Sequence, residues 1–248
     1  MEFKDYFSKQ SDIYIKSRPG YPNKLFQYLA SLTTEHNLAW DCATGNGQAA
    51  IPLAKYFKKV MATDASAQQI NNAILHENVK YAVALADKSG LDTGTVDLVT
   101  IASALHWMDF DAFYTEVNRV LKPDGVFAAW AYYKSYINSA IDPIVKYLVK
   151  DILGEYWPPE RQYITNYYNT IPFPFKQVEA PTFKISLVAN LDFLFGYFYS
   201  WSSTQQYIKL NGKDPVELIK QQLEDAWGDP SETKEIIWDV ILKIGRKE

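Results

Sequence analysis

The chain has 248 residues, of which 48% are hydrophobic and 22% charged, and its formal net charge is −4. This length supports a substantial core, so we expect one α/β domain with insertions over residues 1–248. The negative charge argues against a nucleic-acid partner, because such proteins bind phosphates through clustered Lys and Arg. A single cysteine, Cys42, excludes an intrachain disulfide, and three scattered histidines show no metal-ligand spacing. We therefore expect a cytoplasmic protein with no metal and no stable membrane insertion. The oligomeric state is left open.

Strand and helix patterns alternate through the first half of the chain. Pro22 opens a helical stripe, and Ser66 can cap a later helix through its hydroxyl group. The Pro-Asp-Gly sequence within 121–125 predicts a turn. In chain order we predict helix 22–32, strand 38–42, helix 48–57, strand 59–64, helix 66–75, strands 79–84 and 96–103, helix 110–121 and strand 126–133. This alternation indicates a doubly wound, mostly parallel sheet, whose ligands bind at the carboxyl ends of the strands.

The second half has a different character. It contains two late strands, 175–188 and 233–247, with predicted helices at 142–153, 191–208 and 215–227. Of the 38 Phe, Tyr and Trp residues, 18 fall within 131–201, so this region is expected to differ in role from the rest. We divide the single domain into a core (35–133), a cap and substrate region with one late strand (134–232), and a final strand (233–247).

Polar residues follow the ends of the predicted strands. Asp41 ends the first strand and precedes a turn of small residues, Ala43, Gly45 and Gly47, where a backbone can approach a ligand closely. Asp64 ends the second strand, 17 residues after Gly47, where a carboxylate can accept both hydroxyls of a ribose. Asp87 follows the third strand and could accept from an adenine amino group.

Each of these features also has a structural interpretation. The glycine spacing occurs in ordinary strand-to-helix turns, Asp64 can cap the helix near Ser66, and Asp87 can be a solvated loop acid. The stretch ASALHWMDF (102–110) brings His106 and Trp107 to the mouth of the site, although both could simply pack under the next helix. GNGQAA also fits the fingerprint of dinucleotide-binding enzymes, which carry an acid about 20 residues later.

The motifs together resemble a known family. DCATGNG, ATDAS, ALADKSGLDTGTVDLVTIASALHWMDF and VLKPDGVFAAW are similar, in this order, to the motifs of class I S-adenosylmethionine-dependent methyltransferases, and most similar to the type-11 methyltransferase domain. FSKQSDIYIKSRPGYPNKLFQYL (7–29), LDFLFGYFYSWSSTQQY (191–207) and the terminal WDVILKIGRK resemble the trans-aconitate methyltransferase-like branch. The resemblance covers nearly the whole chain.

The resemblance implies a fold and a set of roles. It implies a seven-stranded sheet of order 3-2-1-4-5-7-6 with the last strand antiparallel, and a helical cap among the late strands. The cofactor would be S-adenosylmethionine, with its methionine end at the turn 43–47 and its adenosine at the two later acids. Asp41 would orient the turn or, through a water, the methionine amino group. The implied cofactor-binding residues are Tyr14, Arg18, Asp41, Ala43, Gly45, Gly47, Asp64, Ala65, Ala86, Asp87 and Ser103.

Ala43 departs from the family pattern, which begins this turn with glycine. Because alanine favours negative φ, we expect the turn to be slightly reshaped. Arg18 would lie near the carboxylate of the cofactor or, alternatively, form a surface salt bridge.

Methyl transfer mainly requires alignment, since the sulfonium is already activated. The acceptor is expected to be a small molecule, and a carboxylate acceptor would need no base. A phenol or amine would make His106 a candidate base, beside Trp107. Candidate walls of the acceptor pocket are Trp130, Tyr132, Tyr133, Tyr197 and Trp201, although aromatic side chains also pack cap against sheet. Two other functions stay open: a cofactor-binding regulatory module without turnover, and an interfacial membrane protein using FLFGYFYSW (193–201).

Overall fold

The computed structural model describes residues 18–248. Within them, a twisted sheet of eight strands has the order β3-β2-β1-β4-β5-β8-β6. β7 lies off this path and pairs with the first half of β8, whereas β6 pairs with the last residues of β8. Strands β1 to β5 are parallel, whereas β8 runs antiparallel to β5, β6 and β7. The strands are β1 (Leu38–Cys42), β2 (Lys59–Asp64), β3 (Val79–Val83), β4 (Val96–Ala102), β5 (Leu121–Tyr136), β6 (Lys176–Gln177), β7 (Lys184–Ala189) and β8 (Lys234–Arg246).

This order confirms the predicted fold class and the antiparallel last strand. The predicted strand 175–188 is divided into β6 and β7, which both pair with β8. Pro181 lies in the interruption and has no backbone N–H to donate to a ladder. The sheet therefore has one strand more than predicted, in the same arrangement.

Most predicted helices are present but shorter. The hydroxyl of Ser66 accepts a hydrogen bond from the Gln69 amide at 3.3 Å, which confirms the predicted cap. The helical segments are α2 (Asn23–Ser31), α3 (Ala50–Leu53), α4 (Ala67–Asn71), η2 (Leu105–Trp107), α5 (Phe110–Val120), α6 (Asp142–Tyr147), the π-helical turn η3 (Leu148–Ile152), η4 (Gly154–Tyr156), α7 (Arg161–Thr165), α8 (Leu191–Tyr199), α9 (Ser202–Asn211), η5 (Val216–Leu218) and α10 (Lys220–Trp227). The segment η4 to α7 was not predicted, because its two consecutive prolines indicated a loop.

The predicted Pro-Asp-Gly turn lies inside a strand. β5 begins at Leu121 instead of at residue 126, and its pairing with β4 shifts between Val96↔Leu121 and Leu98↔Val126. Asp124 has a φ of 59°. The turn residues thus form an irregularity that lets β5 leave helix α5 and join the sheet directly.

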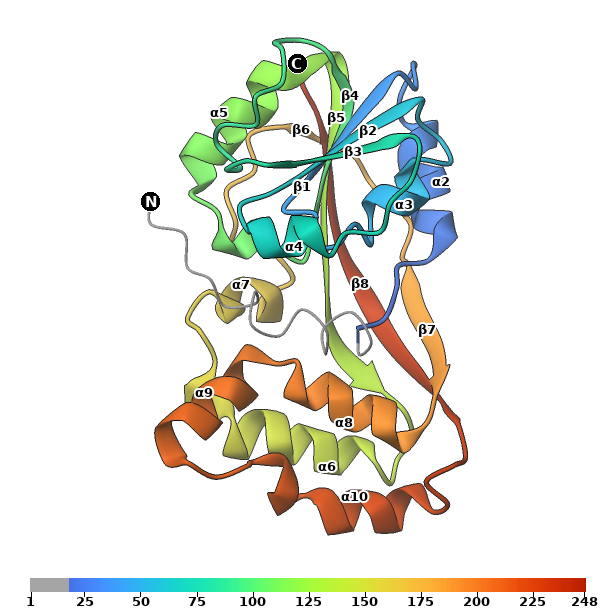
Figure 1. Cartoon of the computed structure of the whole chain (residues 1–248), viewed down its shortest axis with the longest axis vertical. Coiled ribbons are helices and arrows are strands. Elements are labelled where there is room, and N and C mark those ends of the chain that lie inside the picture. Colours follow the sequence, from blue (N-terminus) through green and yellow to red (C-terminus); the bar gives the residue numbers. More distant parts are fainter. Residues whose placement is uncertain (1–17) are drawn as a thin grey trace.

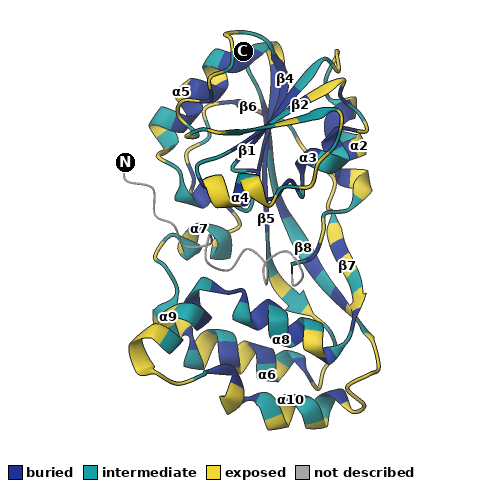
Figure 2. Ribbon diagram, in the orientation of Figure 1, coloured by how far each residue is buried: buried dark blue, intermediate teal, exposed yellow. Residues whose placement is uncertain are grey.

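Three buried clusters hold the molecule together. One lies beneath α5 and includes Trp40 and Phe127; another lies beneath α2 and α3 and includes Phe26 and Trp130. The third fills the cap and includes Trp238. Figure 2 shows the central strands buried, while α4 and α10 carry exposed residues on their outer sides. The sheet is therefore covered on both faces, and the cap has a core of its own.

The cap is built on two long strands. Figure 1 shows β5 running from the upper half down to the cap helices and β8 running from the cap back to the upper half, with α7 between the two halves. The division between sheet half and cap positions the pocket described below. No helix within 18–248 combines the length and apolar character needed to cross a membrane.

Candidate active site

The turn after β1 uses a left-handed backbone at three positions. The φ values are 52° at Ala43, 57° at Gly45 and 95° at Gly47. A Cβ on Gly47 would lie 2.1 Å from the hydroxyl of Tyr81, so only glycine fits there. Alanine therefore does not keep φ negative at Ala43, and the expected slight reshaping of the turn stays a prediction. The Thr44 amide bonds the Thr63 carbonyl at 2.9 Å and helps to hold this conformation.

The carboxylates of Asp41 and Asp64 hold the turn in place. Asp41 is buried, and its oxygens accept hydrogen bonds from the hydroxyls of Thr44 at 2.5 Å and Thr100 at 2.7 Å. Burial raises the pKa of Asp41 to about 6, and the two hydroxyls oppose this shift. Asp64 accepts from the amides of Gly45 and Ser66, each at 2.9 Å. The carboxylate of Asp64 thus ties the turn to the end of β2.

The predicted adenine side of the site lies at the same sheet edge. β2 and β3 pair in parallel with Asp64 opposite Val83, and the Ala84 amide bonds the Asp64 carbonyl at 3.0 Å. Asp87 follows within a few residues and is exposed, while Ala65 and Ala86 are half-buried. Asp64 and Asp87 therefore follow neighbouring strands at one edge and do not lie on opposite flanks.

The end of β4 is the second strained position. Ser103 has a φ of 54°, its amide donates to the Trp130 carbonyl at 2.6 Å, and its hydroxyl lies 3.3 Å from that of Tyr21. His106 and Trp107 follow on η2, with ring centroids 4.7 Å apart. A strained non-glycine residue at a strand's carboxyl end is typical of functional sites.

His106 is a poor base in this setting. Its side chain is buried, and Nδ1 lies 3.1 Å from the hydroxyl of Tyr168, which is itself fully buried. Burial lowers the pKa of His106 to about 3. The imidazole is therefore neutral throughout the physiological range and has little affinity for an acceptor proton.

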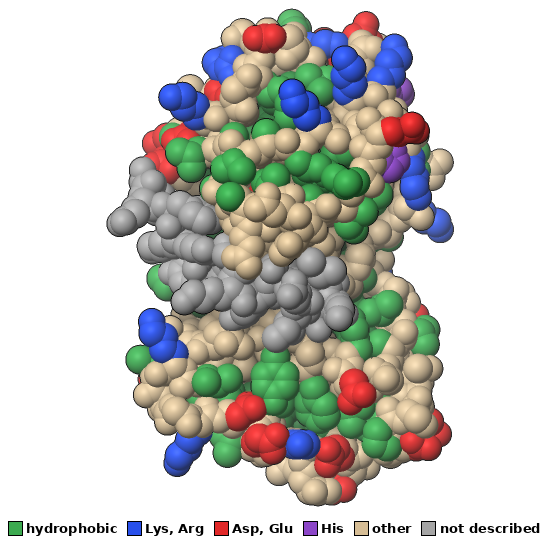
Figure 3. Space-filling model, viewed as in Figure 1, with side chains coloured by type: hydrophobic (Ala, Val, Ile, Leu, Met, Phe, Trp, Pro, Cys, Tyr) green, Lys and Arg blue, Asp and Glu red, His purple; other side chains and the backbone are tan. Residues whose placement is uncertain are grey.

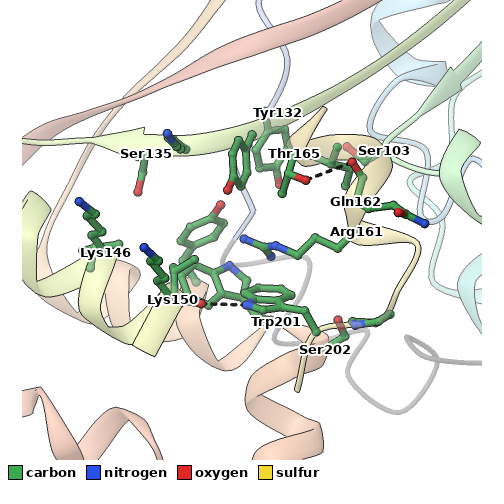
Figure 4. Close-up of a pocket in the computed structure, with 18 of the residues that line it drawn as sticks. Ser103, Tyr132, Ser135, Lys146, Lys150, Arg161, Gln162, Thr165, Trp201 and Ser202 are labelled. Carbon is green, nitrogen blue, oxygen red and sulfur yellow. Dashed lines mark hydrogen bonds between the residues drawn. The ribbon is translucent and has the colours of Figure 1, made fainter. Parts of the chain in front are cut away.

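A pocket of about 870 Å³ opens between the sheet half and the cap. Its inner end contains Ser103, His106 and Trp107, and its outer end reaches α6 and η3. The wall between them combines aromatic rings with basic side chains, as the sticks in Figure 4 show. The lining residues on which the following paragraphs rely are Arg18, Tyr132, Tyr133, Lys134, Ser135, Asp142, Lys146, Lys150, Trp157, Arg161, Tyr197 and Trp201.

Four of the five predicted aromatic walls line this pocket: Tyr132, Tyr133, Tyr197 and Trp201. Trp130 does not. It is fully buried in the cluster under α2, with its ring centroid 5.9 Å from that of Phe26. We correct this prediction: Trp130 belongs to the core, on the strand stretch that is covered by helices on both faces.

Arg18 lies in the pocket wall. Its guanidinium donates to the Tyr132 hydroxyl at 3.2 Å and to the Ser200 carbonyl at 3.0 Å, and it lies 5.3 Å from the centre of the Tyr197 ring. It thus joins β5 to the cap. Its two predicted settings, near the cofactor carboxylate or in a surface salt bridge, stay predictions beside these contacts. Tyr14 falls outside the described residues.

Sequence reasoning missed the basic side of the pocket. Arg161 begins α7, and its Cζ lies 3.2 Å from the ring centre of Trp157 and 5.4 Å from that of Tyr133. Burial lowers the pKa of Arg161 to about 10, and repulsion from Arg18 acts in the same direction. The Lys146–Lys150 spacing of one helical turn was the available signal, but no contiguous basic run marks it.

Comparisons with known proteins agree with this geometry. Residues 40–129 match the family model described as a methyltransferase domain. A methyltransferase-family protein of Dictyostelium discoideum is 35% identical over 255 residues, which covers 100% of this chain and 97% of that protein.

The chain belongs to the class I S-adenosylmethionine-dependent methyltransferases. A solved structure described as a type II methyltransferase from Anaeromyxobacter dehalogenans matches this methyltransferase with a TM-score of 0.87 and 38% identity, over 92% of this chain and 97% of that one. A Saccharomyces cerevisiae protein described as an S-adenosylmethionine-dependent methyltransferase is 28% identical over 64% of this methyltransferase and 59% of that protein. The methyl donor is S-adenosylmethionine, so the dinucleotide interpretation of GNGQAA is set aside.

The residues at the turn fit this donor. A Cβ built on Gly45 meets only Gln69, at 3.8 Å, so the backbone there leaves room for a ligand. Backbone amides of Gly45 and Ser66 hold the carboxylate of Asp64 at the end of β2, and a carboxylate is an acceptor suited to sugar hydroxyls. Among the described residues, no group of three or more His, Cys, Asp or Glu is arranged to hold a metal ion.

Proposed function

We propose that this methyltransferase converts a carboxylate of a small organic acid into its methyl ester. The observation that carries the proposal is the charge of the pocket lining. Among the described residues, five basic side chains, Arg18, Lys134, Lys146, Lys150 and Arg161, line the pocket together with one acid, Asp142. A carboxylate acceptor also accords with the resemblance to the trans-aconitate methyltransferase-like branch.

With one negative charge against five positive ones among the described residues, Asp142 neutralises only part of this lining. Its Oδ1 accepts hydrogen bonds from the amides of Ile137 at 2.8 Å and Asn138 at 3.3 Å, and so serves the start of α6. The lysines of the lining and Arg161 form no ion pair within residues 18–248. The whole chain is acidic, so a basic pocket is a local arrangement that favours anions.

Arg161 is the side chain best placed to hold the acceptor carboxylate. It reaches across the middle of the pocket in Figure 4, toward the side that carries Lys150. Stacking between Trp157 and Tyr133 keeps its planar fork in place, which reduces the entropy lost when it binds a carboxylate. Burial strengthens the attraction, since solvent screens the charge less.

The turn 43–47, Asp64 and Asp87 would hold the donor at the strand ends, as the family resemblance implies. When bound, S-adenosylmethionine supplies an electrophilic methyl group on its sulfonium. The acceptor oxygen forms the new C–O bond as the C–S bond breaks, and the electron pair of that bond stays on sulfur. Because a carboxylate carries no proton at neutral pH, the pocket needs no base. The neutral, buried His106 accords with this, and we assign it and Trp107 to the wall at the transfer end.

The test is transfer of isotope-labelled methyl from S-adenosylmethionine to a panel of carboxylic acids, phenols and amines. We expect label on carboxylic acids only, and its release as methanol in mild alkali, which cleaves methyl esters but not ethers or methylamines. Arg161→Lys keeps the charge but loses the planar fork, and we expect kcat/KM to fall by about tenfold or more. Label that survives alkali, or transfer to phenols alone, would exclude ester formation.

The same assay decides the alternative of a regulatory module without turnover. That alternative rested on Ala43, yet Ala43 adopts the backbone conformation that glycine favours, and the turn is intact. A protein that binds S-adenosylhomocysteine but transfers no label to any acceptor would support it. The described structure gives us no reason to prefer it.

A further inference from the structure

The pocket is larger than one small carboxylate requires. Its volume of about 870 Å³ lies in the upper range for sites that hold drug-sized molecules. It runs from Ser103 at the end of β4 to Lys146 and Lys150 on α6 and η3. An acceptor that fills this length has a second end, and the lining at the outer end indicates its chemistry.

The basic residues fall into two groups. Arg18 and Arg161 lie among the aromatic rings, near enough for their charges to repel each other. Lys134, Lys146 and Lys150 are exposed members of the lining, and Lys134 directly precedes Ser135 on β5. In Figure 4, Lys146 and Lys150 lie side by side, with Ser135 above them, on the side of the pocket away from Ser103 and Gln162.

Without a bound anion, the positive charges of the outer lysines repel one another. Lys146 and Lys150 are four residues apart on a helical segment, a spacing at which like charges destabilise a helix. Asp142, four residues before Lys146, offsets part of this repulsion, and its Oδ1 also accepts hydrogen bonds from the amides of residues 137 and 138. The Nζ of Lys134 lies 5.5 Å from the centre of the Tyr133 ring and forms no ion pair with the described part of the chain.

The surroundings make this cluster distinctive. On the face shown in Figure 3, Asp and Glu side chains predominate over the lower half, where the cap helices lie. Lysines that served only solubility would not need to gather on the wall of a pocket in a cap of this kind. An anionic group placed among the three ammonium groups would offset their mutual repulsion.

We propose that Lys134, Lys146 and Lys150 bind a second anionic group of the acceptor, a carboxylate or a phosphate remote from the carboxylate that is methylated. This rests on the proposed function for the role of the first carboxylate. The acceptor is then an extended molecule with an anionic group at each end, and the aromatic walls contact the carbon skeleton between them. The lysines determine which acids are selected, while the transfer end remains the same for all.

The test uses isothermal titration calorimetry on the full chain saturated with S-adenosylhomocysteine. The probes are α,ω-dicarboxylic acids of increasing length, each paired with its ω-monoamide, which matches it in size but lacks the second charge. A third series carries an ω-phosphate. At the preferred length we expect the dianion to bind about tenfold or more tightly than its monoamide. Preference for carboxylate or for phosphate identifies the group.

The paired variants are Lys146→Gln/Lys150→Gln and, as a control, Lys209→Gln/Lys213→Gln, which removes two cap lysines outside the pocket. We expect the preference for the dianion to fall below about threefold in the first and to remain in the second. Equal affinity of dianion and monoamide, or a preference that survives Lys146→Gln/Lys150→Gln, would overturn the proposal. Failure of methyl transfer to any acid, with the lysine-dependent preference intact, would instead count against the proposed function alone.

Discussion

Two non-glycine residues of this methyltransferase, Ala43 and Ser103, have the left-handed backbone conformation that a Cβ disfavours. Ala43 and Ser103 have φ values of 52° and 54°, and both lie at the carboxyl ends of central strands. Left-handed backbone costs a non-glycine residue about 1–2 kcal/mol. Hydrogen bonds from Thr44 and Ser103 to neighbouring strands offset this cost. Asp124, Tyr167 and Tyr168 also have positive φ, so Ala43 and Ser103 are the strained residues that lie at the strand ends of the proposed site.

The strain at Ala43 gives a stability prediction. Glycine relieves the Cβ strain but loses more backbone entropy on folding, so we expect Ala43→Gly to change stability by between zero and about 1 kcal/mol in the stabilising direction. Urea unfolding measures this. Ala50→Gly, in the buried helix α3, is the contrasting control and should destabilise. Destabilisation by Ala43→Gly would show that the methyl group packs favourably there.

The buried imidazole of His106 gives a pH prediction. The pKa of His106 is about 3 in the folded state and about 6.5 when unfolded, so below pH 6.5 the unfolded state binds the extra proton. The folded state therefore loses about 1.4 kcal/mol per pH unit as the pH falls from 6.5 toward 3. His106→Gln should make stability, measured by urea unfolding, less dependent on pH over this range.

Asp64 gives a binding prediction. Loss of its charge-assisted hydrogen bonds in Asp64→Ala should weaken S-adenosylhomocysteine binding by about tenfold or more, as measured by calorimetry. Since Asp64 also bonds Gly45 and Ser66, thermal unfolding of the variant must be recorded alongside. Asp92→Ala removes an exposed acid away from this edge and is the control. Unchanged affinity in a folded variant would remove Asp64 from the donor site.

At the scale of elements, the segment from α7 to residue 171 positions the proposed acceptor site. It supplies Arg161 to the pocket and contains two consecutive residues with left-handed backbone, Tyr167 and Tyr168. Lys243 on β8 donates to the carbonyls of Tyr168 at 3.0 Å and Ile171 at 3.2 Å. Lys243 therefore holds the segment that carries the guanidinium group of Arg161.

This anchor can be tested separately from the donor site. Lys243→Met should speed amide hydrogen exchange in 161–171 and weaken acceptor binding about threefold to tenfold, with S-adenosylhomocysteine affinity unchanged. Lys247→Met is a matched control, because Lys247 also donates to two carbonyls, those of Asn118 and Leu121, near the end of α5. Unchanged exchange at 161–171 in Lys243→Met, or exchange that is as fast there in Lys247→Met, would contradict the assignment.

The elements that the sequence predicted best are those whose pattern lies within a short stretch of the chain. Strands β1, β2 and β4 were recognisable from apolar runs, and the cap of α4 from Ser66. The basic side of the pocket was not predicted, because Lys134, Lys146 and Arg161 come from three separate elements that only the tertiary fold brings together. Trp130 shows the converse: aromatic content alone does not distinguish a pocket wall from a core residue.

At the scale of the whole molecule, the sheet half and the cap share continuous strands. β8 pairs with β5 along both, from Val126↔Arg246 to Tyr136↔Ile237. Trp238, at the cap end of β8, donates to the hydroxyl of Tyr197 on α8 at 3.2 Å. The two halves therefore cannot separate without breaking the central ladder.

We expect one cooperative unfolding transition. Tryptophan fluorescence should report the same midpoint as far-ultraviolet circular dichroism, because Trp40 and Trp238 lie in different halves. S-adenosylhomocysteine at 100 times its Kd should raise both midpoints by about 5–10 °C. Two separate transitions, or a protease-resistant fragment lacking the cap, would contradict this coupling.

The shared strands also bear on how such an enzyme diversifies. Along β5, residues 126–130 pair with β4 beneath the donor end, while residues 132–136 face the acceptor pocket. A library confined to 132–136 and the pocket-facing positions of α6 and α7 would vary acceptor choice while sparing the donor half. Natural lineages could follow the same route, retaining one methyl source as their products change.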